Sequence, residues 1–392
     1  MRGHAGPATP HGRKGRQLVS DTTDTFGAHD AHKSAPRGEL EEQPGCQPAT
    51  AVSTYSMWSL FRNCRKKFEW RYIHQLVPLH RDPALSFGAL IHECLELWHG
   101  NSPLADVLSH IDSSTRERHS DPAVKADYHL ARAMMQGYAA RYPTEDFITF
   151  ALEETFRGPI INPATGASSR TFTLAGKADG IVKDAQTGQF FLLEHKTAAT
   201  IDGGYIERLW CDFQIQLYCW YIEQTLNIRI AGVIYNILAK AKLRQRQGET
   251  EQEFEQRREA LIAKSKTGKS SAKRKEAEPD EEFEARLLDW YASPDAFHRE
   301  VIYVSRDQID ELRGELWELT QSYLDARRRG TFYKNTGFCF QYNKPCAYFQ
   351  LCRSGGSSNI IENFFRKEAP HGELDASSPD LKDEPEADHP VF

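Results

Sequence analysis

The sequence lacks three features that would assign it to common classes of protein. No apolar run is long enough to span a membrane, so we expect no membrane association. No apolar segment lies near the first residue, so we expect no secretory signal. There is no excess of basic charge either, because 49 lysines and arginines are set against 55 acidic residues, for a net charge of −6. Any nucleic-acid binding must therefore depend on local basic surfaces.

Cysteine is also scarce, with eight residues in a chain of 392. That number does not suggest a disulfide scaffold in a chain of this length. Without an export signal we expect a cytoplasmic, reducing location, where thiols stay free or bind metal. The length is sufficient for one large domain or two modest ones.

Composition divides the chain into a central region and two tails. Residues 1–50 are rich in Gly, Pro and His, and residues 354–392 are acidic with scattered proline. Both segments have too few large apolar residues to offset the entropy of ordering, so we expect them to be disordered. The predicted folded domain is residues 51–353. Within it, residues 240–295 are rich in charge of both signs and predict a helical insertion between two strands of one sheet.

Apolar periodicity predicts the elements of the central region. Helical spacing favours helices over residues 53–72, 85–98, 101–143 (with a break near 121), 210–226 and 307–328. Strand patterns cover residues 147–156, 172–182, 190–197, 228–238 and 298–305.

The stretch from Phe172 to Thr197 carries the strongest signal for chemistry. It reads FTLAGKADGIV, a polar turn KDAQTGQ, and FFLLEHKT, which predicts a β-hairpin. Asp179 lies on the first strand, and Glu194 and Lys196 project to the same side of the second. Two carboxylates placed in this way can hold a hard divalent cation, and a lysine beside them can stabilise charge or help to deprotonate a water. The alternative is a set of solvated charges.

Three other side chains accompany the hairpin acids. His92 borders the apolar stripe of the helix at 85–98 and is a ligand candidate, although a hydrogen-bonded core histidine is the commoner case. Gln214 and Tyr218 share one face of the helix at 210–226. They could form part of a half-buried aromatic stripe, contact a backbone phosphate or orient a metal ligand.

Two basic stretches also stand out. One spans Arg62 to Arg71. The other spans residues 264–275 of the insertion and reads KSKTGKSSAKRK. A solvated surface is the default interpretation of each stretch, with contact to nucleic acid as the alternative.

Three cysteines, Cys339, Cys346 and Cys352, lie within fourteen residues of each other. Such density in a reducing compartment indicates a metal site. An iron–sulfur cluster requires four thiolates, and Cys64, directed inward and flanked by cations, is the candidate for the fourth. Zinc and unligated thiols remain as alternatives.

In this order, the motifs resemble the PD-(D/E)xK nuclease superfamily in its RecB-like, AddB-like branch, which carries a C-terminal cysteine cluster. Relatives in that branch include CRISPR-adaptation and phage exonucleases. The resembling motifs cover residues 53–353 and are STYSMWSLFRNCRKKFEWRY, FGALIHECLE, GKADGIV, LLEHKT, QIQLY and CFQYNKPCAYFQLC. The chain departs from the branch in the six-residue gap between Cys339 and Cys346, where relatives often have a CxxC pair, and in the charged insertion.

The resemblance implies a fold, a metal site and a cluster. The fold is α/β, a restriction-endonuclease-like mixed central sheet flanked by helices, with the cysteine cluster acting as a clip between the two ends of the domain. His92, Asp179, Glu194 and the His195 carbonyl would bind Mg²⁺ or Mn²⁺, and Lys196 would act on the attacking water. Gln214 and Tyr218 would position DNA. A [4Fe-4S] cluster would be held by Cys64, Cys339, Cys346 and Cys352.

The implied activity is that of a DNA exonuclease in DNA repair, recombination, or phage or CRISPR DNA processing, in a bacterial or phage-infected cell. A helicase or recombination protein would be the partner. Two other hypotheses stay open. One is a non-catalytic DNA-binding or assembly subunit that keeps the fold, and the other is a zinc-stapled adaptor in which the hairpin acids have no catalytic role.

Overall fold

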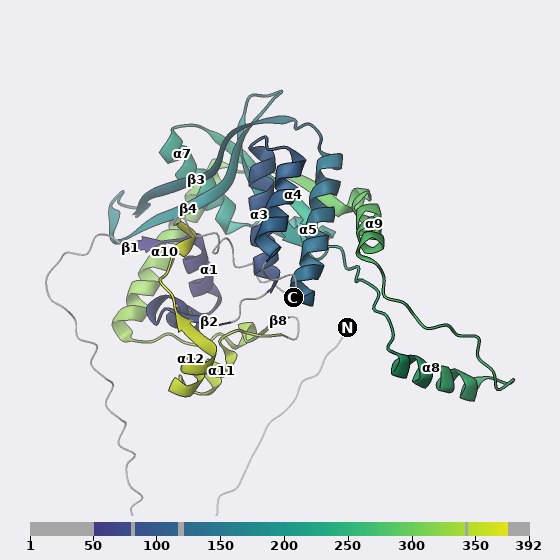
Figure 1. The fold of residues 1–392 in the computed structure, drawn as a ribbon. Coiled ribbons are helices and arrows are strands. Elements are labelled where there is room, and N and C mark those ends of the chain that lie inside the picture. Colours follow the sequence, from purple (N-terminus) through teal and green to yellow (C-terminus); the bar gives the residue numbers. More distant parts are fainter. Residues whose placement is uncertain (1–50, 80–82, 117–120, 342–343, 375–392) are drawn as a thin grey trace, which may run out of the picture. The chain divides into compact units, whose positions relative to one another are not determined.

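The computed structural model describes residues 51–79, 83–116, 121–341 and 344–374, which all lie in one unit of the chain, Pro48–Phe392. The tail predicted at residues 1–50, with Cys46, lies outside the described residues, as do residues 375–392. A mixed sheet carries helices on both faces (Figure 1). This arrangement confirms the predicted α/β class with a mixed central sheet flanked by helices.

Strand β4 organises the central sheet because it pairs with three other strands. β3 runs antiparallel along the whole of one edge of β4. The other edge is shared: β1 pairs in parallel with residues 172–174, and β5 pairs antiparallel with residues 180–183. Beyond β5, the sheet continues with β6 in parallel and then β7 antiparallel. The strands are β1 (Ala51–Ser53), β3 (Phe147–Ile161), β4 (Ser168–Asp184), β5 (Phe190–Ala198), β6 (Ile230–Ala239) and β7 (Phe297–Tyr303).

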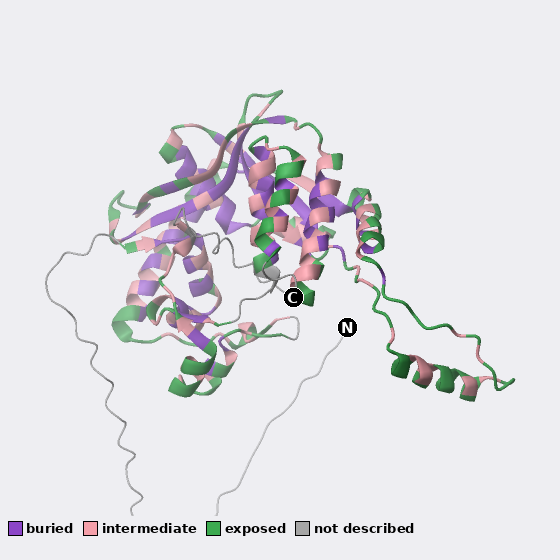
Figure 2. Ribbon diagram, viewed as in Figure 1, coloured by how far each residue is buried: buried purple, intermediate pink, exposed green. Residues whose placement is uncertain are grey.

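Two helical layers cover the sheet, and buried residues concentrate between them and the strands (Figure 2). Because side chains alternate along a strand, neighbouring residues of β6 enter different cores: Ile237 packs with α7 and α10, and Leu238 packs with α3 and α5. One layer contains α1 (Tyr55–Asn63), α7 (Phe213–Leu226) and α10 (Arg306–Arg329), and the other contains α3 (Pro83–His99), α4 (Leu104–Thr115), α5 (Pro122–Arg141) and α9 (Asp280–Tyr291).

Short elements complete the described chain, and two of them join its ends. β2 (Leu76–Pro78) pairs antiparallel with β10 (Phe365–Lys367). The others are α2 (Arg65–Phe68), η1 (Glu69–Ile73), α6 (Gly203–Leu209), α8 (Glu251–Lys264), η3 (Pro294–Ala296), η4 (Thr336–Phe338), β8 (Phe340–Gln341), β9 (Lys344–Pro345), α11 (Phe349–Arg353), α12 (Ser358–Phe364) and η5 (Gly372–Leu374). Among the described residues, no helix is long and apolar enough to cross a membrane.

The predicted continuous helix over residues 53–72 is wrong at Cys64. α1 ends at Asn63, Cys64 is extended (φ −158°, ψ 106°), and a short α2 and a π-helix follow. The cause is a tertiary contact: the Asn335 backbone N–H donates to Cys64 Sγ (3.4 Å) and its side-chain amide donates to the Asn63 carbonyl (2.9 Å). These two bonds tie the break in the helix to the C-terminal region.

Two other predicted segments need correction. The tail expected to be disordered from residue 354 instead contains α12 and β10, and Phe365 is buried where β10 pairs with β2. The charged insertion does lie between paired strands, β6 and β7. Its last helix, α9, is not a charged excursion, because it packs on α5 and buries three apolar residues, Phe283, Leu287 and Tyr291.

Candidate active site

The hairpin of β4 and β5 opens where the sequence places its two acids. The strands pair only from Gly180 to Lys183, opposite residues 190–193, so the ladder ends directly before Asp179 and Glu194. Across the opening, the Asp179 carboxylate accepts a hydrogen bond from the His195 backbone N–H (2.9 Å). The Asp179 side chain thus takes the place of the next backbone hydrogen bond of the ladder and fixes the spacing between the two strands where they separate.

His92 reaches this opening from α3. Its Nδ1 lies 3.2 Å from Asp179 Oδ2, and both side chains are about one-tenth exposed or less. The prediction that His92 borders the apolar stripe of its helix is confirmed, since its neighbours Ile91 and Leu95 are fully buried. The structure therefore brings together two of the three predicted metal-binding side chains, from segments 87 residues apart.

Lys196 forms the other half of the site. Its ammonium lies 2.9 Å from Glu194 Oε1 and donates to Gln214 Oε1 at 3.2 Å. Gln214 is placed by the start of α7, where Asp212 caps the helix by accepting from the Gln214 backbone N–H (2.8 Å). The other oxygen of Asp212 accepts from the Tyr235 hydroxyl (2.6 Å), which ties this helix end to β6.

Gln214 and Tyr218, which are expected to contact DNA, are both buried. Gln214 is 3% exposed and Tyr218 is 7% exposed, and the Tyr218 ring packs edge-on against Phe156 (4.9 Å between centroids). Contact of either side chain with DNA stays a prediction. The sequence interpretation did not predict the hydrogen bond that Gln214 accepts from Lys196, which is not one of the expected metal ligands.

A buried polar network behind β5 was missed by the sequence interpretation. Asn236 donates to His195 Nδ1 and to the Tyr138 hydroxyl, both at 3.0 Å. Arg299 donates to Asn236 Oδ1 (3.3 Å) and makes a two-pronged ion pair with Glu145 (2.5 and 2.8 Å). Because Arg299 occupies the amide oxygen, the Asn236 amide group faces His195. The one signal in the sequence was an asparagine within an otherwise apolar strand (IYNIL).

The same network keeps two imidazoles neutral. The His99 ring stacks on the His195 ring (5.2 Å, 9° between planes). Burial lowers the pKa of His99 to about 3, and the Arg299 guanidinium adds to the effect. Burial also lowers the pKa of His195 well below its ordinary value, against the opposing influence of Asp179. With Nδ1 of His195 accepting from Asn236, the ring proton is assigned to Nε2.

Cys64 lies near the C-terminal cysteines, although it is far from them in sequence. Burial raises the pKa of Cys339 and of Cys346, and in both cases Cys64 and Cys352 raise it further, as expected for neighbouring thiols. Cys64 Sγ accepts from the Asn335 N–H (3.4 Å), and Cys352 Sγ accepts from Trp70 Nε1 (3.3 Å). N–H groups directed at sulfur are the outer-shell contacts that tune thiolate-ligated metals.

Among the described residues, neither the expected cation ligands nor the cysteines form a complete set of metal ligands. Within the described ranges, no three His, Cys, Asp or Glu side chains form an arrangement that could hold a metal ion. Four residues of the candidate site form two pairs, His92 with Asp179 and Glu194 with Lys196. The types of donor still fit a divalent cation, because buried carboxylates and an imidazole are what Mg²⁺ and Mn²⁺ accept.

The fold is a mixed sheet flanked by helices, with two acids and a lysine where neighbouring strands separate, and it is consistent with the restriction-endonuclease-like class. The comparison with known families agrees. Residues 53–353 match the sequence model of the PD-(D/E)XK nuclease superfamily, and the chain belongs to that superfamily. No curated protein matches the chain. Proteins of this superfamily typically use divalent metals, which indicates a metal-dependent nuclease.

Proposed function

We propose that this protein is a Mg²⁺- or Mn²⁺-dependent deoxyribonuclease, and within that class an exonuclease of the RecB-like branch. The observation that carries the proposal is the opening of the β4–β5 hairpin at Asp179 and Glu194, with Lys196 held beside them. A nuclease fold implies DNA as the substrate. Repair, recombination or phage DNA processing, with a helicase or recombination partner, is the context that we infer from the resemblance.

In this proposal His92, Asp179, Glu194 and the His195 carbonyl hold the cation. A bound divalent metal supplies a lowered pKa for water and neutralises charge on the scissile phosphate. The His195 N–H orients the Asp179 carboxylate, which lies beside the His92 ring. The two side chains are therefore placed to bind the same cation. Glu194 and Gln214 hold the Lys196 ammonium, which can hold the attacking water or stabilise the charge that develops on phosphorus-bound oxygen.

The test is cleavage of end-labelled single- and double-stranded DNA with Mn²⁺ or Mg²⁺ by the wild type and by Lys196→Ala. We expect the substitution to lower the rate by about 100-fold or more, as for loss of a proton-transfer or charge-stabilising group. Lys183→Ala is the matched control, because Lys183 lies at the far end of the same hairpin and its ammonium covers the Phe190 ring. Equal rates for wild type and Lys196→Ala would contradict the proposal. Binding without any cleavage would support the non-catalytic subunit, and the label pattern would reveal polarity.

We further propose that Cys64, Cys339, Cys346 and Cys352 hold a [4Fe-4S] cluster. Their mutual influence and the N–H groups directed at two of the sulfurs support this assignment. A metal centre bound by all four sulfurs would stabilise the clip between α1 and the C-terminal segment.

Metal content of anaerobically purified protein tests the cluster. We expect about four iron atoms per chain and visible absorption, and we expect Cys346→Ser to lose both and to unfold at a lower temperature. Cys211→Ser is the control, because Cys211 is exposed and lies outside the cysteine site. One zinc per chain without iron would identify the zinc alternative, and a metal-free protein would support unligated thiols.

A further inference from the structure

The charged insertion contains an arm, residues 245–279, which rises from an anchored base. Glu278 at the base is buried, accepts two bonds from the Arg286 guanidinium (2.7 and 2.9 Å) and accepts from the Arg246 backbone N–H (2.9 Å). Beside it, Asp280 pairs with Lys125 of α5 (2.8 Å). The base is therefore fixed to the helical layer of α5 and α9.

The two legs of the arm hold each other beyond the base. The Glu278 N–H donates to the Arg246 carbonyl (3.0 Å), and the Glu249 N–H donates to the Lys275 carbonyl (2.9 Å). Arg257 of α8 braces both legs, with a two-pronged bond to Glu249 (2.5 and 2.8 Å) and a bond to the Lys273 carbonyl (2.8 Å). Hydrogen bonds from Arg257 lower the pKa of Glu249 to about 2, so this brace stays charged at neutral pH.

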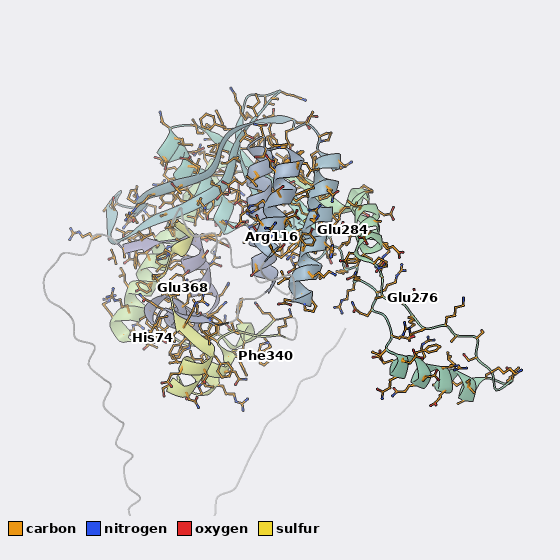
Figure 3. The ribbon with its side chains drawn as sticks, in the orientation of Figure 1. His74, Arg116, Glu276, Glu284, Phe340 and Glu368 are labelled. Atoms are coloured by element: carbon orange, nitrogen blue, oxygen red, sulfur yellow. The ribbon has the colours of Figure 1, made fainter. Side chains whose placement is uncertain are left out.

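The tip of the arm carries positive charge alone. Residues 264–275 contain six cations and no acid, in a protein with a net charge of −6. Two of the cations, Arg274 and Lys275, lie near Glu251 and Glu249. The other four are exposed and have no carboxylate partner among the described residues: Lys264, Lys266, Lys269 and Lys273. Figure 3 labels Glu276, the first acid after this run, on the leg that returns to α9.

The residue types at the tip favour one class of binding partner over others. Its residues include no apolar side chain larger than alanine, and none of the residues of α8 is buried. A protein partner would require an apolar centre to its interface, which the tip does not offer. Exposed lysines among Ser, Thr and Gly instead suit contact with the phosphates of a nucleic-acid backbone. Figure 1 shows α8 well apart from the sheet, so such a contact would lie outside the hairpin site.

We propose that the tip of the arm, residues 264–275, binds the phosphate backbone of DNA at a distance from the proposed active site and without reading sequence. This inference rests on DNA as the substrate of the proposed function. The four unpaired lysines give it a measurable size: each phosphate neutralised adds about 0.9 to the slope of log affinity against log salt for duplex DNA.

The test measures binding without cleavage, in EDTA and in the Lys196→Ala background, by fluorescence anisotropy of a labelled duplex over a salt series. Replacing all four lysines by Gln is expected to reduce the slope by up to about 3.6, at ~0.9 per phosphate contact. Replacing the same four by Arg keeps the charge and is expected to keep the slope. An unchanged slope in the Gln variant overturns the inference.

A deletion provides a second, independent variant. Because the Glu249 N–H is bonded to the Lys275 carbonyl, residues 250–274 can be replaced by an Asn-Gly turn without disturbing the base. This variant is expected to reproduce the slope of the Gln variant. Loss of binding to vesicles of anionic lipid, with the DNA slope unchanged, would identify a membrane partner and overturn the inference. If the variants change the slope but the wild-type protein never cleaves DNA, the inference about the arm stands and the proposed nuclease activity is contradicted.

Discussion

At the scale of single residues, the site depends on the side chains that position the Lys196 ammonium. Its ammonium has a charged partner, Glu194, and a neutral one, Gln214, which reaches it from the first turn of α7. Because Gln214 is buried and accepts a hydrogen bond from Lys196, we propose that it positions the lysine. An amide oxygen in this place fixes the direction of the lysine without neutralising its charge.

We expect Gln214→Leu to lower the turnover number of DNA cleavage by about tenfold to 100-fold, because the ammonium loses the acceptor that directs it and the reacting geometry loosens. Gln214→Glu keeps an acceptor at the same position but adds a buried negative charge that neutralises the ammonium, so it should not restore the activity. Steady-state kinetics of both variants, with DNA affinity in EDTA as the control, checks this. A loss of DNA affinity equal to the loss of turnover would indicate that Gln214 serves substrate binding instead.

At the scale of elements, helices α5 and α9 cross closely at a glycine. A Cβ at Gly137 would lie 2.5 Å from the Cβ of Tyr291, a distance that forces the helices apart. Tyr291 is itself buried, and its hydroxyl donates to the Ala239 carbonyl of β6 (3.1 Å), so it cannot move away freely. This contact makes the end of the charged insertion part of the core.

We expect Gly137→Ala to lower the free energy of unfolding by about 1–3 kcal/mol, the usual cost of overpacking a close contact. Gly314→Ala is the matched control, because Gly314 also lies within a helix, α10, and a Cβ there meets nothing within 4 Å. The control should gain about 0.5–1 kcal/mol from better helix propensity. Urea unfolding of the three proteins checks both signs, and a Gly137→Ala protein as stable as the control would contradict the close crossing.

At the scale of the whole molecule, stability should depend on pH through the buried network. His99 faces the Tyr138 hydroxyl, Glu145, Arg299 and the His195 ring. Its pKa is about 3 in the folded protein against an ordinary 6.5. Between these values the unfolded chain binds a proton that the folded chain does not, so the free energy of unfolding falls as pH drops below 6.5.

We expect the wild type to lose about 1.4 kcal/mol per pH unit from this residue in that window, and His99→Gln to lose correspondingly less. His110→Gln should act in the opposite direction. The hydrogen bond that the His110 ring donates to Glu93 raises the pKa of His110, so protonation of His110 stabilises the fold in acid and its removal steepens the loss. Urea unfolding in EDTA at neutral and mildly acidic pH measures both. Equal pH slopes for wild type and His99→Gln would show that His99 titrates normally.

Local patterns were sufficient for most elements and for the chemical types at the site. Alternation in FTLAGKADGIV and FFLLEHKT predicts the hairpin, and the same alternation places Glu194 and Lys196 on one side, where they pair. Side-chain periods of 2 and 3.6 are properties of a short stretch of backbone, so they can be read without knowledge of the fold. Membership of the nuclease superfamily follows from such motifs taken in order.

Only the tertiary structure decided what lies around those motifs. The break of the helix at Cys64 depends on Asn335, the orientation of Asn236 depends on Arg299, and the burial of Gln214 depends on the contact between α7 and the sheet. These contacts join segments that are far apart in sequence, and no local period carries information about them. The sequence by itself determined the acids, the lysine and the strands that bear them. The fold alone decided which neighbours hold them, because burial and pairing are properties of the packed chain.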